Sequence, residues 1–524
     1  MPVTTRWRLG LLPWALLGCG ARTGLEVRDA GPLPPQCVTD QDCDDRAFCN
    51  GQETCQEERC IPGAPLVCLG STACSTVACD EEARACRTTP ATEDRDRDGF
   101  RAPRPGTSPG SPDRCGDDCD DDDPEVHPGA VERCNGVDDD CNGIIDDNAT
   151  LTPTGEAVRV SEAVVAPSGP GGVQWTGSRY GVSYWGYDSG RAHVYFRQID
   201  RTGAPSAMQQ QVTTTPNDAF GAALAWNGRV LGAVWQDRRD PSGGYEIYFN
   251  RLTPEGERLG PDQRISFARG FSVNPAIVWT GEEFLLVWQD ERDSVGEGGY
   301  EIYAQRVDAE GRLIQPNQRL TREPSNSEAP SVAVHDGGVA VAWMDGRSGR
   351  RAVWFASFTR GLTRVTVDRQ VSPVNQSAVA PQLVWNRDRW MLAWYDDDEA
   401  SPDHELWGAT RDASGNPLVA PRRLTMDAGF SRYPSLLPLG DRVLVAWADD
   451  RDGAQYSLWA RVFNTDFSPL SAESRVTRTA MGPTASVYPS LVRGPEGDVG
   501  VLFRDQREGR IQAWFTRLRC AIPR

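Results

Sequence analysis

From about residue 155 to the C-terminus, short apolar runs alternate with turns rich in Gly, Asp and Pro. Apolar runs bounded by such turns predict β-strands, and residues 330–372 contain four of them in succession. One run in each group ends in an aromatic residue, one further residue and Asp, usually with Arg close behind. The seven instances are Trp185/Asp188 (one residue longer), Trp235/Asp237/Arg238, Trp288/Asp290/Arg292, Trp343/Asp345/Arg347, Trp394/Asp396, Trp447/Asp449/Arg451 and Phe503/Asp505/Arg507.

The spacing of these phrases predicts the architecture. Successive aromatic positions lie roughly 50–56 residues apart, which is typical of a β-propeller with four strands in each blade. We therefore predict an all-β fold, a seven-bladed β-propeller over residues 155–524. An outer-strand phrase also occurs before the first Trp phrase, so residues 158–161 are expected to complete the last blade and close the ring. The innermost strands are expected to be introduced by Pro275, Pro330, Pro381, Pro434 and Pro489.

Recurrence in every blade favours a structural role for the Trp and Asp. Trp would pack between neighbouring blades, while Asp would accept backbone hydrogen bonds in a turn and pair with Arg. A ring of carbohydrate or cation sites is the alternative. Tyr245-Glu246 and Tyr300-Glu301 are similar to a glycosidase Tyr/Glu pair, but their duplication at equivalent positions favours strand packing. The four histidines are not paired with an evident Ser or Cys nucleophile.

The N-terminus has the pattern of an export signal. Arg6 and Arg8 precede a short apolar stretch from Leu9 to Leu17, which is too short to span a bilayer. Leu16-Leu17-Gly18-Cys19 resembles the bacterial lipobox, which implies a signal peptide over residues 1–18 and a lipid on Cys19. An ordinary secretory signal is the alternative. Residues 19–36, rich in Gly, Pro and charge, are expected to tether the protein to a membrane.

Cysteine usage supports export to an oxidising compartment. With Cys19 assigned to lipid, the other cysteines are disulfide candidates, concentrated in a cysteine-rich module over residues 37–90. Because an odd number of cysteines falls in that module, at least one should pair outside it, and Cys520 is the expected partner. The candidates are Cys37, Cys43, Cys49, Cys55, Cys60, Cys68, Cys74, Cys79, Cys86, Cys115, Cys119, Cys134, Cys141 and Cys520.

Residues 91–149 form an acidic module. The net charge of the chain is −19, which argues against binding of nucleic acid, and most of it lies between residues 113 and 147. Charge of this density keeps a segment unfolded unless cations neutralise it. Asp138, Asp140, Asn142 and Asp146, with Gly143, follow EF-hand-like spacing, and so do Asp94, Asp96 and Asp98 with Gly99. Neither loop has the usual final Glu. Hard oxygen ligands favour calcium; a solvated acidic linker is the alternative.

The same acidic module resembles a known motif. Asp94–Phe100, followed by residues 119–143 with Pro-Gly-Ala, Cys-Asn-Gly and Asp-x-Asp-Cys, looks like the MopE-type metal-binding motif of secreted bacterial proteins. The family name implies copper. His127 is the only nearby imidazole and the segment contains no Met, so we favour calcium and keep copper at His127 as the second option. Cys115, Cys119, Cys134 and Cys141 are expected to form two disulfides that clamp the loops.

Together these patterns predict a bacterial lipoprotein anchored in the cell envelope, at the outer membrane or cell surface. We expect a calcium-stabilised stalk and a propeller head that binds a surface glycan or a protein without catalysis. The rival hypothesis is a glycan-active hydrolase or lyase that uses the central funnel of the propeller, and a purely structural envelope component is a third.

Overall fold

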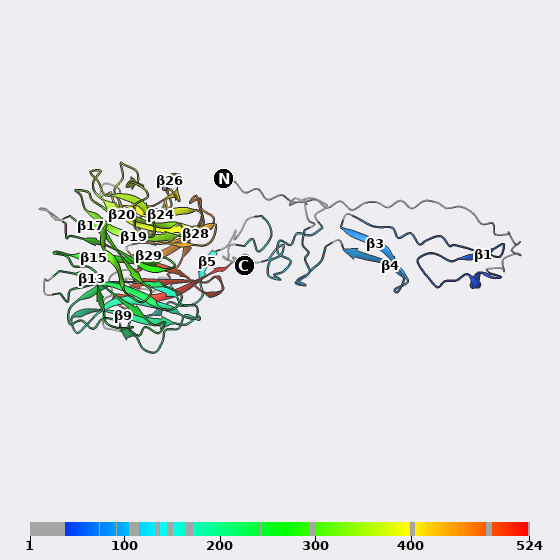
Figure 1. Ribbon diagram of the computed structural model, residues 1–524, viewed down its shortest axis with the longest axis horizontal. Coiled ribbons are helices and arrows are strands. Elements are labelled where there is room, and N and C mark those ends of the chain that lie inside the picture. Colours follow the sequence, from blue (N-terminus) through cyan, green and yellow to red (C-terminus); the bar gives the residue numbers. More distant parts are fainter. Residues whose placement is uncertain are drawn as a thin grey trace, which may run out of the picture. The chain divides into compact units, whose positions relative to one another are not determined.

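The computed structural model describes residues 37–72, 74–90, 92–103, 115–130, 137–143, 150–162, 171–240, 244–293, 299–398, 404–453, 455–477 and 485–521. The chain divides into two compact units: residues 1–93 with 106–115, and residues 94–105 with 116–524. The predicted all-β class is confirmed (Figure 1). Within the described ranges, no helix has the length and apolar character needed to cross a membrane.

The first unit consists of small hairpins held by disulfides. After the 3-10 turn η1 (Asp40–Asp42), β1 (Thr54–Gln56) pairs with β2 (Arg59–Ile61), and β3 (Ser75–Asp80) pairs with β4 (Ala85–Pro90). Among the described residues of this unit, Cys37 and Cys43 are the only buried apolar side chains, so cross-links replace a hydrophobic core. The bridges are Cys37–Cys55, Cys43–Cys60, Cys49–Cys79, Cys68–Cys86 and Cys74–Cys115.

This connectivity corrects two predictions. The cysteine-rich module does use a partner from outside residues 37–90, but the partner is Cys115 and not Cys520, because residues 106–115 belong to the same compact unit as Cys74. Cys115 is therefore not available for a second bridge within the acidic module, where Cys119 bonds to Cys141. Cys134 lies outside the described residues.

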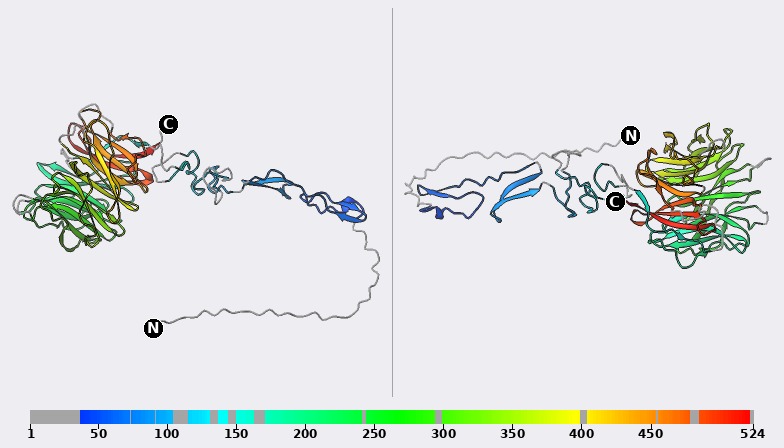
Figure 2. Two further views of the ribbon diagram at one scale, coloured as in Figure 1. Left: turned by 90° about the horizontal axis from the view of Figure 1, so that it is seen from above. Right: turned by 180° about the vertical axis from the view of Figure 1, so that it is seen from behind.

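The second unit contains the predicted propeller of seven antiparallel sheets (Figures 1 and 2). In blades 1 to 6 the innermost strand comes first in the chain. The strands of blades 1 to 3 are β7 (Val173–Trp175), β8 (Tyr180–Asp188), β9 (Arg191–Ile199) and β10 (Gln210–Gln211); β11 (Ala219–Trp226), β12 (Leu231–Asp237), β13 (Glu246–Leu252) and β14 (Gln263–Arg264); β15 (Ser272–Trp279), β16 (Glu283–Asp290), β17 (Glu301–Asp308) and β18 (Leu313–Arg319).

Blades 4 to 6 repeat this order. Their strands are β19 (Ser327–His335), β20 (Gly338–Asp345), β21 (Ala352–Phe358) and β22 (Arg369–Gln370); β23 (Ala378–Asn386), β24 (Arg389–Asp396), β25 (Leu406–Asp412) and β26 (Pro417–Arg423); β27 (Ser431–Pro438), β28 (Arg442–Asp449), β29 (Ser457–Asn464) and β30 (Ser474–Arg475).

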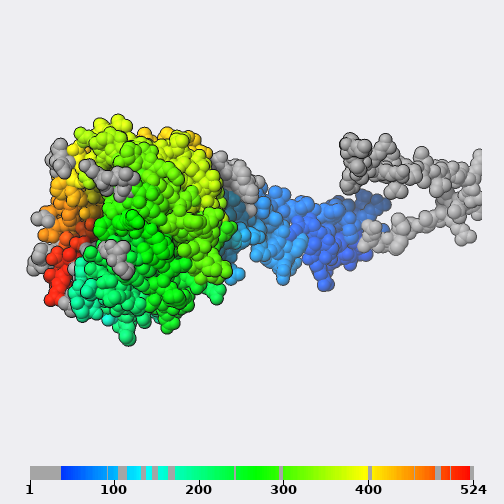
Figure 3. All heavy atoms as spheres, turned by 60° about the vertical axis from the view of Figure 1, so that its left-hand side comes forward, coloured from blue at the N-terminus to red at the C-terminus, as the bar shows by residue number. Residues whose placement is uncertain are grey.

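Blade 7 joins the two ends of the propeller. Its strands β31 (Val487–Arg493), β32 (Val499–Asp505) and β33 (Gln512–Ala521) are completed by β5 (Thr150–Pro153) and β6 (Val158–Arg159). Arg159 pairs with Trp514 and Pro153 with Leu518. The closing segment that the outer-strand phrase indicates thus lies in the last blade, and β5 adds a second pairing that the phrase did not indicate. In Figure 3 the red C-terminal surface borders the cyan-green surface of blade 1.

Seven hydrophobic clusters form the core, one at each junction between neighbouring blades. In the junction of blades 3 and 4, for example, Leu285 and Val287 pack against Val341 and Trp343. The cluster that closes the ring joins blade 1 to blade 7 and includes Val182, Tyr184, Leu502 and Phe515. Six of the seven aromatic side chains of the repeat are buried against the preceding blade, and Trp185 is the exception.

The repeated Trp and Asp have the structural role that their recurrence predicts. In blade 3 the Trp288 indole Nε1 donates to Asp290 Oδ2 at 2.7 Å, and Arg292 donates to the same carboxylate through its backbone N (2.9 Å), Nε (2.8 Å) and Nη2 (2.6 Å). The guanidinium also stacks on Tyr303, 4.4 Å from the ring centroid. Burial opposes ionisation, but the hydrogen bonds from Arg292 hold the pKa of Asp290 below its ordinary value.

Two members of the repeat differ from the sequence interpretation. In blade 2 the arginine that binds Asp237 is Arg239, two residues after the Asp as in blades 3, 4, 6 and 7, and not Arg238. In blade 1, Tyr184 and not Trp185 occupies the position of the repeated aromatic, because Tyr184 pairs with Tyr195 as Trp235 pairs with Tyr248. The extra residue in this blade places Trp185 in the junction with blade 2 instead.

The prolines lie inside the innermost strands and do not introduce them. Each follows a residue with positive φ, and the pairing register shifts there by a β-bulge, as between Val273 and Ala276 around Pro275. The proline fits because the bulge takes its nitrogen out of the ladder. The same bulge occurs at Pro330, Pro381, Pro434 and Pro489.

Candidate metal centre

The first acidic loop gathers three carboxylates. One carboxylate oxygen from each of Asp94, Asp96 and Asp98 lies within 4.8 Å of the others. The other oxygens fold the loop: Arg97 N donates to Asp94 Oδ1 (2.7 Å), Asp98 N to Asp96 Oδ1 (3.2 Å), and Phe100 N to Asp98 Oδ1 (2.7 Å). Each aspartate thus has one oxygen that supports the turn and a second that remains for a ligand.

Asp118 lies near this group, although it comes from a later part of the chain, and it interacts electrostatically with Asp96 and Asp98. Its backbone N donates to the Arg101 carbonyl at 3.1 Å, which brings residue 118 beside the loop. The Asp118 side chain is fully buried (0 % exposed). Its Oδ1 accepts from Asp120 N at 2.9 Å, while its Oδ2 has no hydrogen-bond donor among the described residues. The Oδ2 atoms of Asp96 and Asp98 are buried and equally without a donor.

The electrostatics of this centre are unfavourable without a cation. Burial, followed by the charges of Asp98 and Asp96, raises the pKa of Asp118 above its ordinary value. The pKa of Asp96 is also raised, by burial first and then by the charges of Asp98, Asp121 and Asp94. Asp121 completes the rim, where its Oδ2 accepts from Arg95 Nε at 3.1 Å. A buried carboxylate oxygen without a donor is costly, and a metal ion supplies the missing positive charge.

The second acidic loop is a tight turn. Asp138 accepts from Asn142 N through Oδ1 (3.1 Å) and from Gly143 N through Oδ2 (2.8 Å), and Asp140 Oδ1 also accepts from Asn142 N (3.1 Å). Gly143 has φ +92°, as a reversing loop requires. The Cys119–Cys141 bridge fastens this turn beside Asp118. Asp146 lies outside the described residues, so its place in the loop stays a prediction.

His127 occupies a packing position between the loops. Its ring stacks on Phe100, with 4.6 Å between centroids and 3° between planes, and Nδ1 lies 3.3 Å from the Pro128 carbonyl. Its backbone N donates to the Asp139 carbonyl at 2.9 Å, which links the two loops. No histidine belongs to any group of close metal-binding side chains that the described residues form.

The residues present fit a metal ion with hard oxygen ligands. Asp94, Asp96, Asp98 and Asp118 would hold it. Asp94, Asp96 and Asp98 each place one oxygen within 4.8 Å of the others, and Asp96, Asp98 and Asp118 each have a buried oxygen without a donor among the described residues. When bound, the ion would supply positive charge and cross-link segments 94–100 and 118–121. The sequence identified the first three of these ligands. Asp118 was missed because its role depends on backbone pairing with Arg101, which no local spacing reveals.

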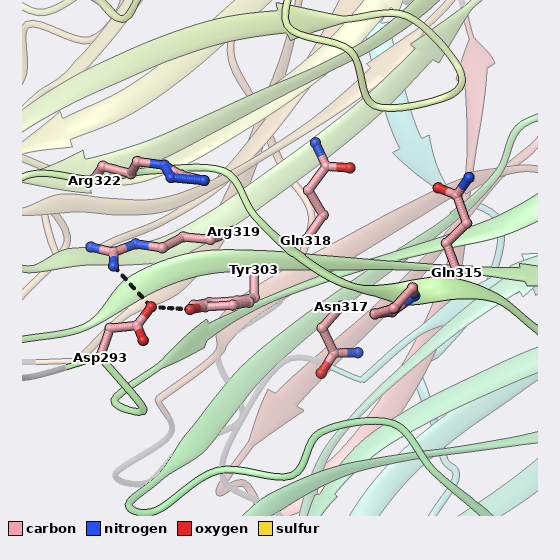
Figure 4. A pocket seen from close by; sticks show the side chains of 8 residues that line it. Asp293, Tyr303, Gln315, Asn317, Gln318, Arg319 and Arg322 are labelled. Carbon is pink, nitrogen blue, oxygen red and sulfur yellow. Dashed lines mark hydrogen bonds and ion pairs between the residues drawn. The ribbon is translucent and has the colours of Figure 1, made fainter.

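The propeller has a shallow depression beside the outer strand of blade 3, and the ion pair in it recurs at equivalent positions in other blades. In Figure 4, Arg319 and Tyr303 both point to Asp293; Arg319 Nη1 donates to Asp293 Oδ2 at 2.8 Å, and the Tyr303 hydroxyl also donates to it. The corresponding pairs in other blades are Arg264–Asp240, Arg475–Asp452 and Arg159–Glu508. An acidic residue three positions after the repeated Asp thus binds an outer-strand Arg, which the sequence analysis did not recognise.

The duplicated glutamates also have structural partners. Arg264 Nη2 donates to Glu246 Oε1 at 2.8 Å, and Arg319 Nη2 donates to Glu301 Oε1 at 2.5 Å. Ser266 and Thr321 donate to the same carboxylates at 2.5 Å each. Equivalent buried pairs in neighbouring blades support strand packing for Tyr245-Glu246 and Tyr300-Glu301.

Comparison with known proteins identifies the motif but not an activity. The Cu-binding MopE family model, which describes a metal-binding motif, matches residues 118–147. That range includes Asp118 and the second loop, and residues 118–147 therefore carry this motif. No curated protein matches the chain.

Similar solved structures are distant. A protein of unknown function from Dyadobacter fermentans is 12 % identical over 71 % of this chain and 99 % of that chain, with a TM-score of 0.43. A phage phi92 endosialidase is 10 % identical over 72 % and 70 %, with a TM-score of 0.40. An endo-arabinase from Bacteroides thetaiotaomicron is 11 % identical over 44 % and 88 %, with a TM-score of 0.32. Scores this low carry no argument about activity.

Proposed function

We propose that this protein is a calcium-stabilised envelope lipoprotein whose propeller binds a partner outside the cell without catalysis. The observation that carries the proposal is the set of three buried oxygens, Oδ2 of Asp96, Asp98 and Asp118, which have no hydrogen-bond donor among the described residues. Calcium takes six to eight oxygen ligands in flexible geometry, and such a donor set suits it better than copper, which favours imidazole and sulfur.

The first test is metal binding by residues 20–524 after treatment with EDTA. Titration calorimetry should detect calcium binding, and thermal unfolding should show a transition that calcium raises and EDTA lowers. Asp118→Ala should weaken calcium binding at least tenfold, because it removes a buried ligand. Asp308→Ala removes a carboxylate in the propeller that pairs with Arg312, so it is the control outside the acidic module and should leave binding unchanged.

Either of two outcomes would overturn the calcium assignment. The first is the absence of calcium binding together with an unfolding transition that EDTA does not move. The second is tight copper binding that excess calcium does not displace and that His127→Ala abolishes, which would place copper at the histidine.

The lipid anchor and the envelope location are part of the same proposal. Leu16-Leu17-Gly18-Cys19 supports them, and the disulfides Cys74–Cys115 and Cys119–Cys141 are consistent with an oxidising compartment. Metabolic labelling with a fatty acid should mark the wild-type protein in membrane fractions, and Cys19→Ser should abolish the label. Unlabelled wild-type protein released into the medium would contradict the anchor.

A further inference from the structure

The bulges of the innermost strands carry different residues in blades 6 and 7 than in blades 2 to 5. At each bulge one residue adopts positive φ, close to +55°, and these residues lie on the strands nearest the axis. Blades 2 to 5 place small or polar residues there: Gly221, Asn274, Ala329 and Ala380. Blades 6 and 7 place Tyr433 and Tyr488, both at φ 56°. A bulky side chain in this region is strained, and such strain is a pointer to function.

The two strained tyrosines form a cluster with a third. The rings of Tyr433 and Tyr488 have centroids 4.1 Å apart, and Tyr395 lies 5.6 Å from Tyr433. Tyr395 occupies the position between the repeated Trp and Asp of blade 5. In blades 2 and 3 that position is Gln236 and Gln289, whose side chains accept from the backbone N of the next blade's bulge.

Two arginines next to these rings have no carboxylate partner among the described residues. Arg504 lies over Tyr488, with its Cζ 5.6 Å from the ring centroid. Arg432 lies 5.9 Å from the Tyr395 centroid, and within the described part of the chain its side chain donates only to His404 Nδ1, which lies 2.8 Å from Nη2. The repeat arginines of the same blades are different, because Arg451 and Arg507 both bind carboxylates. All five side chains of the cluster are half-buried, so the guanidinium charges are partly desolvated while still accessible.

We propose that Tyr395, Arg432, Tyr433, Tyr488 and Arg504 bind an acidic saccharide, that is, a glycan whose sugar rings carry carboxylates. Aromatic faces pack against the apolar face of a sugar ring, phenol hydroxyls bond its hydroxyls, and a guanidinium binds a carboxylate in bidentate geometry. This inference rests on the proposed function, in which the propeller is the binding head, and it names the site and the class of ligand.

The electrostatics of the cluster agree with an anionic ligand. Burial, together with a hydrogen bond to Tyr433, raises the pKa of Tyr488, and burial raises that of Tyr395. The phenols therefore stay neutral and can donate hydrogen bonds. Asp397 pairs with Arg351, and its Oδ1 lies 3.8 Å from His404 Nδ1, the atom that accepts from Arg432.

The repeat itself supplies variants that the fold tolerates. Tyr433→Ala installs the residue that blades 4 and 5 carry at the bulge, and Arg504→Gln installs the residue that blades 2 and 3 carry before the Asp. Binding should be measured by calorimetry with calcium-loaded full-length protein, using oligogalacturonate and oligoglucuronate, with neutral galacto-oligosaccharides of equal length. An acidic-glycan array extends the panel. Arg322→Gln, an exposed arginine elsewhere on the propeller, is the control.

Wild type and the control should bind at least one acidic glycan at least tenfold more tightly than the neutral one. Tyr433→Ala and Arg504→Gln should each weaken this binding at least tenfold while the unfolding midpoint stays the same or rises. Absence of binding to every acidic glycan would overturn the inference, as would binding that both variants retain. A lower unfolding midpoint with unchanged binding would assign the tyrosines to packing. None of these outcomes affects the calcium measurement, so the two proposals fail separately.

Discussion

Removal of one buried carboxylate of the repeat should cost far more stability than removal of an exposed one with similar hydrogen bonds. Asp290 and Asp308 both belong to blade 3, and both accept from an arginine and from backbone N–H groups of a turn. Their burial differs: the side chain of Asp290 is 0 % exposed and that of Asp308 is 21 % exposed. Asp290 also accepts from Trp288 and Ser272, so the comparison measures its burial together with these two additional hydrogen bonds.

In Asp290→Asn an amide NH₂ group replaces one carboxylate oxygen, so a hydrogen-bond donor faces groups that are themselves donors. Trp288 Nε1, Arg292 Nη2 and Ser272 Oγ all approach Asp290 Oδ2, at 2.7, 2.6 and 2.8 Å. The substitution also leaves the Arg292 charge without its partner. Breaking a buried ion pair from one side costs about 3–5 kcal/mol. The exposed pair of Asp308 with Arg312 contributes about 0.3–1 kcal/mol, so Asp308→Asn should cost no more than that.

Urea unfolding in the presence of calcium, followed by Trp fluorescence, measures the two free energies of unfolding. We expect Asp290→Asn to lose at least about 2 kcal/mol more than Asp308→Asn. Trp288→Phe is an intermediate case, because it removes one hydrogen bond and keeps an aromatic ring. Equal losses of unfolding free energy in the two Asn variants would refute the argument that the buried environment of the repeated Asp makes it important for stability.

Three further predictions follow from the same contacts. Hydrogen bonds from their arginines lower the pKa values of Asp290 and Asp449 despite burial, so the stability that these carboxylates contribute is present above the unfolded pKa near 3.8 and is lost as pH falls through the lower folded pKa. The free energy of unfolding should therefore fall less steeply between pH 6 and 3 in Asp290→Asn than in the wild type. An unchanged slope would contradict this. Leu151→Ala in β5 should cost about 2–4 kcal/mol in urea unfolding, because Leu151 is buried in the core between blades 6 and 7, and a loss below about 0.5 kcal/mol would mean that β5 does not help to close the ring. Peptide mapping without reduction should recover a Cys74–Cys115 cross-link, and any other partner for Cys74 would show that the connectivity is wrong.

The architecture was predictable because each blade has the same local physics. An aromatic residue must fill the junction with the preceding blade, and the Asp must satisfy the indole, the turn and an arginine. These needs recur in full in blades 2, 3, 4 and 6 and in part in the other blades, so they leave a regular spacing in the sequence. In blade 1 the phrase points to Trp185, because one extra residue shifts it. Only the pairing of Tyr184 with Tyr195 identifies Tyr184 as the repeated aromatic.

The metal centre was partly predictable for the same kind of reason. Alternation of Asp94, Asp96 and Asp98 before Gly99 is a local pattern, and the loop folds as that pattern indicates. Asp118 is one of several adjacent aspartates, and sequence gives no reason to select it. Its selection comes from a hydrogen bond between its backbone and Arg101 and from complete burial, which are both properties of the folded chain.

The backbone conformation in the tyrosine and arginine cluster differs from what the local sequence predicts. Tyr433 and Tyr488 each precede a proline, and the residue before proline favours an extended backbone. A strand pattern with a tyrosine in it therefore predicts nothing unusual. The bulge forces positive φ on both residues, and blades 4 and 5 show that Ala suffices for the same backbone. Both tyrosines also pack against the hydrophobic cluster between blades 6 and 7, while blades 4 and 5 build the same bulge with Ala, so the bulge by itself does not demand a tyrosine. The Tyr433→Ala variant therefore separates ligand binding from packing.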